Sequence, residues 1–129
     1  MGLEIETRIF RVTREDLVAY ADASGDHNPI HQDEEVARSV GLPGVIAHGM
    51  YTLALAARYV EEWAGPGRVA TLGAKFTKPV VVPVDGTDVV IEGVVEERDG
   101  DSVVTLRITC EGLEVLRGCK ATLRGRVDG

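Results

Sequence analysis

The sequence predicts an α+β fold in which a curved antiparallel sheet wraps around one long central helix. Two observations lead to this prediction. From about residue 70 to residue 123, apolar residues alternate with polar ones, and turn-forming pairs such as Asp85-Gly86 and Glu111-Gly112 interrupt the alternation, as in a meander of antiparallel strands. The segment from about Gly49 to Trp63 is different, because its first turns are apolar on every side. A helix of that kind must be covered all round, and the sheet is the element available to cover it.

Local signals place the remaining elements. Thr13 and Asp16 are spaced as in a capping box, which predicts that a helix begins there, and the turn formers of residues 24–29 end it. Gly65-Pro66-Gly67 is expected to end the long helix, and Asp99-Gly100 to form a further turn between strands. The expected elements, in chain order, are a strand at 3–10, helices at 13–23, 33–40 and 49–63, and strands around 70–76, 104–110 and 113–123. The strand residues expected to face the core are Leu3, Ile5, Ile9, Ala70, Leu72, Ala74, Phe76, Val104, Leu106, Ile108, Cys110, Leu113, Val115, Cys119, Ala121 and Leu123.

Length and charge limit the classes of function. A chain of 129 residues with 44% hydrophobic and 27% charged residues is expected to form one domain, residues 1–129. The formal net charge of −7 argues against nucleic acid and against an anionic membrane surface as partners. The N-terminal residues do not resemble a secretory signal, and no apolar run is long enough to cross a membrane.

The two cysteines, Cys110 and Cys119, fall on two strands of a predicted hairpin. In that register Cys119 lies opposite a residue about three positions from Cys110, or roughly 10 Å away, which is too far for a disulfide. Both are therefore expected to be reduced packing residues, and the protein is expected to be cytoplasmic.

Residues capable of acid–base chemistry gather between the first helix and the central helix. His27, His31 and His48 all lie there, together with Asp26 and Asn28. Each of these residues alone is explained as a turn former or a helix cap. A metal site is not indicated, because His27 and His31 would share a face only on a helix, and the intervening Asn28-Pro29 argues against one.

The run Tyr20-x-x-x-Ser24-Gly25-Asp26-x-Asn28-Pro29-Ile30-His31, followed by Ile46-Ala47-His48-Gly49-Met50, resembles the hydratase motif of the MaoC-like family. That family comprises (R)-specific enoyl-thioester hydratases and (3R)-hydroxyacyl dehydratases with the hotdog fold. Among its members, the chain resembles the catalytic B-type subunit of the mycobacterial (3R)-hydroxyacyl-carrier-protein dehydratase. The resemblance implies the architecture that the hydrophobic pattern also requires.

The resemblance also implies roles for particular residues. Asp26 and His31 would be the catalytic pair, Asn28 would orient the pair or the water, and the backbone N–H of Gly49 would bind the thioester carbonyl oxygen. His48 and Met50 would contact the substrate. The chemistry fits, because moving one proton at Cα and another at the β-oxygen needs two groups on one face, and a helix N-terminus stabilises the oxyanion that develops. Which member of the pair is the acid and which the base stays open.

The implied reaction is reversible syn hydration and dehydration between trans-2-enoyl and (3R)-3-hydroxyacyl thioesters of CoA or acyl carrier protein, without a metal or other cofactor. The resemblance further implies a homodimer or a heterodimer with a sister hotdog subunit. Two alternatives remain. A hotdog thioesterase uses the same fold with a carboxylate base, and a substrate-binding partner subunit would lack one member of the catalytic pair.

Overall fold

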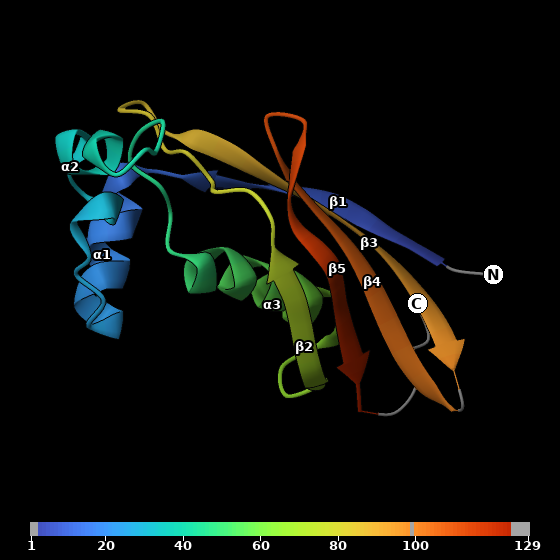
Figure 1. The fold of residues 1–129 in the computed structure, drawn as a ribbon. Helices are drawn as coiled ribbons and strands as arrows, with labels where there is room; N and C mark the ends of the chain where they lie inside the picture. Colours follow the sequence, from blue (N-terminus) through green and yellow to red (C-terminus); the bar gives the residue numbers. More distant parts are fainter. Residues whose placement is uncertain (1–2, 99, 125–129) are drawn as a thin grey trace.

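The computed structural model describes residues 3–98 and 100–124, and its centre is a single antiparallel sheet that curves around a helix (Figure 1). The sheet has the strand order β1-β3-β4-β5-β2. The strands are β1 (Leu3–Val12), β2 (Val69–Phe76), β3 (Thr87–Arg98), β4 (Asp101–Cys110) and β5 (Leu113–Leu123). The helices are α1 (Arg14–Ser24), α2 (Glu34–Ser39) and α3 (Gly49–Ala64), with a 3-10 turn, η1 (Pro29–His31), between α1 and α2. This is the expected α+β hotdog arrangement.

The helix boundaries follow the predicted local signals. The Thr13 hydroxyl accepts the N–H of Asp16, whose carboxylate accepts the N–H of Thr13, so the capping box is complete. α1 ends at Gly25, whose φ of 80° is a left-handed conformation that glycine adopts without strain. α3 ends at Gly65, within the Gly-Pro-Gly run. Of the predicted turns, Asp99-Gly100 includes Asp99, which lies outside the described residues.

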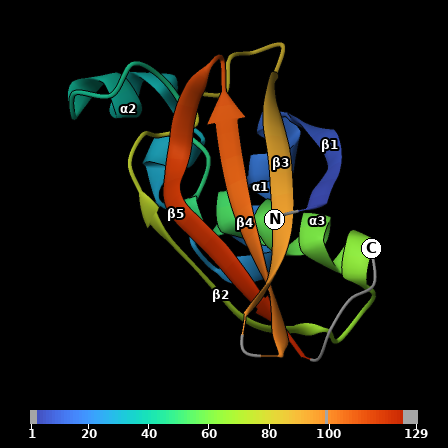
Figure 2. The same cartoon turned by 90° about the vertical axis from the view of Figure 1, so that its right-hand side faces the viewer.

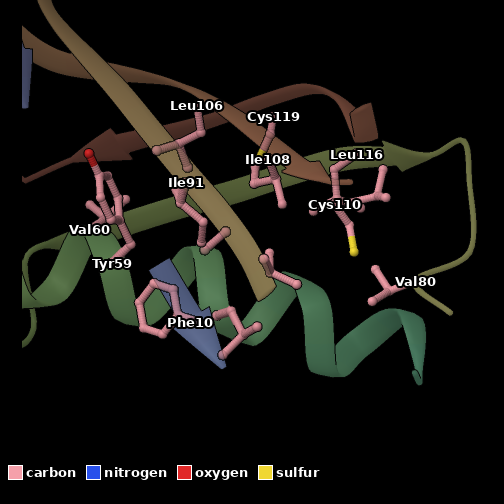
Figure 3. Packing of buried hydrophobic residues seen from close by; sticks show 14 of the residues in the cluster. Phe10, Tyr59, Val60, Val80, Ile91, Leu106, Ile108, Cys110, Leu116 and Cys119 are labelled. Carbon is pink, nitrogen blue, oxygen red and sulfur yellow. The ribbon is translucent and has the colours of Figure 1, made fainter. Parts of the chain in front are cut away.

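α3 packs its buried side against the concave face of the sheet. Figure 3 shows Tyr59 and Val60 of this helix facing Ile91, Leu106 and Ile108 of the central strands. The prediction that α3 is covered all round is wrong for this chain alone. Met50 is 59% exposed and Ala54 is also exposed, because the sheet covers only one side of the helix (Figure 2).

Five strand residues that were expected to face the core are exposed instead: Leu3, Ile9 (62% exposed), Ala70, Phe76 (56%) and Leu113. For Ile9 the cause is irregular register, because a strand that gains one residue turns its following side chains to the other face. β1 shifts register between Ile5 and Arg8, so Phe10 and Val12, rather than Ile9, are buried. Phe76 keeps the inner face, opposite the buried Leu116, but it lies at the end of the edge strand β2.

Glycine 93 lies in the middle of β3, where the central helix comes closest to the sheet. A Cβ added at Gly93 would lie 3.0 Å from Tyr59 Cε2 and 3.3 Å from side-chain atoms of Ile5 and Leu106. The absence of a side chain there lets the Tyr59 ring lie against the sheet, and the Tyr59 hydroxyl donates to the backbone oxygen of Glu6.

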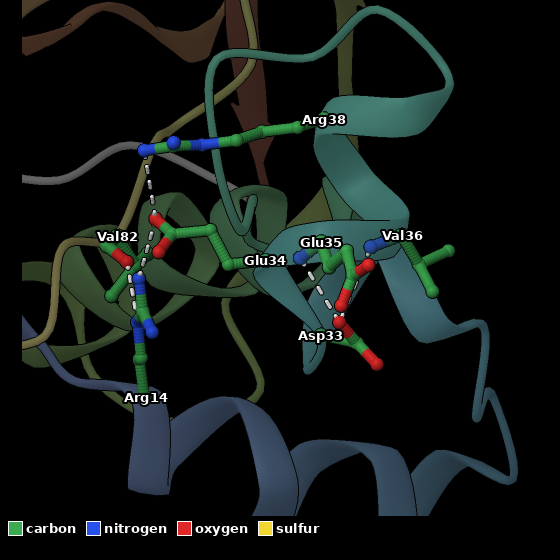
Figure 4. A network of polar contacts seen from close by, with 7 residues as sticks. All are labelled: Arg14, Asp33, Glu34, Glu35, Val36, Arg38 and Val82. Atoms are coloured by element: carbon green, nitrogen blue, oxygen red, sulfur yellow. Dashed lines mark hydrogen bonds and ion pairs between the residues drawn. The ribbon is translucent and has the colours of Figure 1, made fainter.

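A polar network joins the small helices to the chain that leads into the sheet (Figure 4). Arg14, at the start of α1, donates to the backbone oxygen of Val82 at 2.9 Å and contacts the Glu34 carboxylate at 3.2 Å. Arg38 approaches the same carboxylate at 3.7 Å. These contacts link α1 to α2 on either side of the turn that carries Asp26 and His31.

Cys110 and Cys119 are free and buried, as expected. Cys119 pairs with Leu106, four positions before Cys110, so the two thiols are on separate parts of the hairpin. Among the described residues, no helix combines the length and the hydropathy needed to cross a bilayer.

Candidate active site

The turn after α1 is held by hydrogen bonds from its own side chains. The Ser24 hydroxyl accepts the N–H of Asp26, and the Asp26 carboxylate accepts the N–H of Asn28, each at 3.2 Å. The Asn28 side chain accepts the N–H of Ile30 and so caps η1. The local reasons for Ser, Asp and Asn in a turn therefore apply here, and Asn28 uses its side-chain oxygen within the turn.

His31 ends η1 and is only 7% exposed. Its Nδ1 lies 2.8 Å from the backbone oxygen of Ile46. A carbonyl oxygen can only accept a hydrogen bond, so Nδ1 carries the proton. In the neutral ring Nε2 is consequently bare, with a lone pair that can take up a proton.

His48 is 2% exposed and precedes α3 as its N-cap residue, without a hydrogen bond from its side chain to the helix. Its Nε2 donates to the backbone oxygen of Asp26 at 3.0 Å. The neutral ring then has a bare Nδ1, which is buried and has no hydrogen-bond partner in the described part of the chain. The ring of Tyr20 lies against His48 at 4.9 Å between centroids, with the planes 60° apart.

These residues converge on one point, although Asp26 is exposed and the two histidines are buried. A carboxylate oxygen of Asp26, a ring nitrogen of His31 and a ring nitrogen of His48 all lie within 4.8 Å of one another. The rings of His31 and His48 are stacked, with centroids 3.7 Å apart and planes inclined by 21°. The separation leaves room for one water or a substrate hydroxyl between the acid–base groups.

Two histidines and a carboxylate are also a common set of metal ligands. The stacking disfavours that use. The lone pair of an imidazole nitrogen points outward in the plane of its own ring. Because the two ring planes are nearly parallel, the two lone pairs do not point at one ion that lies close to both nitrogens. Metal binding would require the two rings to separate.

Gly49 is the first residue of α3, so no carbonyl one turn earlier within the helix accepts its N–H. Two cavities of about 290 Å³ each meet beside it. One contains Tyr20, Ser24, Asp26, His48 and Met50, and the other is mainly apolar, lined by Ile46, Ala47, Thr52, Thr77, Lys78, Pro79, Val80, Val115 and Leu116. Both share Gly49 and Phe76. His31 is not among the residues that line the first cavity. His48, whose ring is stacked on that of His31, is one of them.

The structure thus brings together Asp26, His31, His48, Gly49 and Met50 among the residues singled out from the sequence. Asn28 instead uses its side chain within the turn. His27 is outside the cluster, as expected, with its side chain 56% exposed and 4.0 Å from the Asp22 carboxylate.

Two residues of the site received no role in the sequence analysis. Tyr20 is the first residue of the quoted motif, and its place in that motif is the sequence signal that could have indicated a role in the site. Phe76 was expected in the core, but it stands over Gly49, where a Cβ would lie 3.1 Å from its ring. Phe76 pairs with the buried Leu116 and so keeps the inner face, but it is exposed because it ends the edge strand β2.

The comparisons with known proteins agree with this geometry. A family model described as "MaoC like domain" matches residues 2–112. The chain belongs to the MaoC-like domain family. It is 38% identical over 117 residues to 3-hydroxyacyl-thioester dehydratase X of Mycobacterium tuberculosis, and the match covers 91% of this chain but only 38% of that protein.

Solved structures of MaoC-like proteins share the fold. A MaoC-like dehydratase superposes with a TM-score of 0.93 at 35% identity, over 97% of this chain and 40% of that one. The (R)-hydratase of A. caviae involved in PHA biosynthesis superposes with a TM-score of 0.82 at 25% identity, over 97% of both chains. The predicted hotdog fold and the predicted family are therefore confirmed.

Proposed function

We propose that this MaoC-like domain is a hydro-lyase that interconverts trans-2-enoyl and (3R)-3-hydroxyacyl thioesters by syn addition or removal of water, in fatty-acid metabolism. The observation that carries the proposal is the convergence of Asp26 and His31 within 4.8 Å beside the start of α3. Relatives named as 3-hydroxyacyl-thioester dehydratase and (R)-hydratase support it. The match to the (R)-hydratase covers 97% of both chains.

The tautomer of His31 supports one division of roles within the pair in the dehydration direction. Its Nδ1–H is engaged by Ile46, so the bare Nε2 is the group that removes the proton from Cα of the 3-hydroxyacyl thioester. Asp26, protonated, delivers a proton to the 3-hydroxyl, which leaves as water while the Cα–Cβ double bond forms. Hydration runs through the same steps in reverse. No cofactor takes part in either direction.

The backbone N–H of Gly49 stabilises the charge that develops on the thioester oxygen when the Cα proton leaves. This N–H lies at the positive end of the sixteen-residue helix α3, and its orientation is set before the substrate arrives. One such donor is worth about 3 kcal/mol of transition-state stabilisation in enzymes where it has been removed. Met50 contacts the substrate in the same cavity.

The mainly apolar cavity beside Phe76 suits the acyl chain, since apolar side chains form most of its lining. The thioester would then lie at Gly49, where the two cavities meet. CoA or an acyl carrier protein would carry the thioester from the open side of this junction.

We further propose that the chain acts as one hotdog domain, residues 1–129, that pairs with a second hotdog subunit, either a copy of itself or a sister chain. Met50 and Phe76 are exposed apolar side chains at the site, and β2 ends the sheet as an uncovered edge strand. A monomer at micromolar concentration in light scattering would contradict the pairing. The free, buried cysteines fit a reducing compartment, and we place the protein in the cytoplasm.

The test of the proposed reaction is incubation with crotonyl-CoA. A hydratase removes the absorbance of the conjugated enoyl thioester without releasing thiol, whereas a thioesterase releases free CoA that reacts with a thiol reagent. We expect the first outcome, with (3R)-3-hydroxybutyryl-CoA as the product. Thiol release would identify a thioesterase, and neither change, with trans-2-enoyl thioesters of several lengths, would indicate a binding subunit.

A further inference from the structure

His48 connects all the parts of the site. Its Nε2–H holds the backbone oxygen of Asp26 at 3.0 Å, and its ring covers the ring of His31 at 3.7 Å. Its own backbone oxygen accepts the N–H groups of Tyr51 and Thr52, which ties it to the first turn of α3. One buried residue thereby links the backbone of Asp26, the imidazole of His31 and the helix that presents Gly49.

We propose that His48 is a positioning residue that sets the separation of Asp26 from His31, an inference that rests on the proposed function. It replaces the expectation that His48 serves to bind substrate. Asp26 lies on an exposed turn, where its N–H donates to the Ser24 hydroxyl and its carboxylate accepts the N–H of Asn28. Among the described residues, the bond from His48 is the one that joins Asp26 to a distant element.

The stacking of His48 on His31 restrains the other member of the pair. A ring that ends a short 3-10 turn can rotate about its side-chain bonds unless something lies against its face. Ile46 holds one edge of the His31 ring, and the flat face of His48 restrains its plane. Together the two contacts keep the bare Nε2 of His31 in a constant position relative to the Asp26 carboxylate.

The bare Nδ1 of His48 indicates that the residue is not there for stability alone. A buried acceptor without a donor costs free energy, and an apolar ring of similar size would avoid that cost. Within the described chain, the only side-chain polar atom of His48 with a hydrogen bond is Nε2, and its partner is the backbone oxygen of Asp26. A histidine that served packing alone would have no need of this bond.

Three substitutions separate the two contacts. His48→Phe keeps a flat ring but has no donor, His48→Gln keeps an N–H donor at a similar reach but has no ring, and His48→Leu has neither. The exposed His27 provides the matched control in His27→Phe and His27→Gln, which should leave turnover unchanged. Steady-state hydration of crotonyl-CoA gives kcat and KM, and calorimetry gives the melting temperature.

We expect kcat to fall about 10-fold in His48→Phe and His48→Gln and about 100-fold in His48→Leu, because a displacement of about 1 Å can cost that much. KM should stay within about threefold, since Gly49 and the mainly apolar cavity are retained, and the melting temperature of His48→Phe should not fall. A raised KM with unchanged kcat would show instead that His48 binds substrate.

Loss of folded protein in all three variants, with wild-type kcat in whatever remains folded, would also overturn the inference. An inactive wild-type protein would refute the proposed function itself, which is a different outcome from active wild type with active His48 variants.

Discussion

Nδ1 of His31 lies 2.8 Å from the backbone oxygen of Ile46, in the segment that leads to α3. The bond comes from outside the turn that carries His31, so the ring is oriented by the tertiary fold. His48 is held by its other nitrogen, Nε2, which donates to Asp26. The two stacked rings are therefore opposite tautomers, and each has one bare nitrogen.

This assignment predicts the nitrogen NMR spectrum of the imidazoles. At about pH 8.5, where unperturbed imidazoles are neutral, His31 should show a protonated Nδ1 and a bare Nε2, and His48 the reverse. The exposed His27 should show the averaged shifts of a free ring. Long-range proton–nitrogen correlation spectra of uniformly labelled protein measure this. The same tautomer in both buried rings would contradict the hydrogen bonds described here.

The catalytic pair is tested by removing each acid–base group in turn. Asp26→Asn and His31→Ala should each lower kcat for crotonyl-CoA hydration by several orders of magnitude, because each removes one of the two proton transfers. Both variants should remain folded in circular dichroism, since the core residues are untouched. Asp22→Asn and His27→Ala are matched controls from the same region with exposed side chains, and they should keep wild-type turnover. Wild-type kcat in either catalytic variant would show that the pair is misassigned.

The crowding of Gly49 by Phe76 predicts the effect of a single methyl group. Gly49→Ala places a Cβ 3.1 Å from the Phe76 ring, at the junction where the thioester would bind. The ring is exposed and can move, so stability should change by less than about 1 kcal/mol, while kcat/KM should fall about 10-fold or more. The double variant Gly49→Ala/Phe76→Ala should stay impaired relative to Phe76→Ala alone. Full recovery in the double variant would assign the loss to displacement of Phe76 instead.

The sequence predicted correctly the features that are specified locally or by a contiguous motif. Thr13 and Asp16 form their capping box, and Gly65 ends α3, because the residues involved are close together in the chain. The hydratase motif likewise singled out Asp26 and His31, and the fold brings a carboxylate oxygen and a ring nitrogen of the two within 4.8 Å of each other. These signals require no knowledge of the tertiary structure.

The features that were missed depend on how distant segments meet. Ile9 changes face because β1 shifts register against β3, and the alternation within one strand does not reveal such a shift. Phe76 keeps the inner face but is exposed, because β2 is an edge strand and Phe76 is its last residue. The stack of His48 on His31 forms only when the segment before α3 crosses the turn after α1. α3 was expected to be enclosed by one chain, whereas its apolar residues leave a side uncovered.

Burial makes the Cys119 thiol unreactive. Loss of contact with water raises the pKa of Cys119 from its ordinary value of 9.0 to about 11, because burial disfavours the thiolate. At pH 8 the folded protein should therefore be alkylated by iodoacetamide at Cys119 about 100-fold more slowly than in denaturant, and the rate should rise with pH toward 11. Peptide mass spectrometry of a Cys110→Ala variant isolates the Cys119 signal. Rapid native labelling at pH 8 would contradict the burial described for this thiol.

The close approach of Tyr59 to Gly93 predicts which strand glycine can accept a side chain. Gly93→Ala would place a Cβ 3.0 Å from Tyr59 Cε2 and 3.3 Å from side-chain atoms of Ile5 and Leu106, so these buried side chains must shift to make room. We expect a loss of about 1–3 kcal/mol in the free energy of unfolding, as for other overpacked cores. Gly73 in β2 is the matched control, because it has no heavy atom within 4 Å of an added Cβ and no positive φ. Gly73→Ala should be neutral or stabilise by up to about 1 kcal/mol. Urea titration of both variants measures the difference, and equal effects at the two positions would mean that Tyr59 does not approach β3 as closely as described.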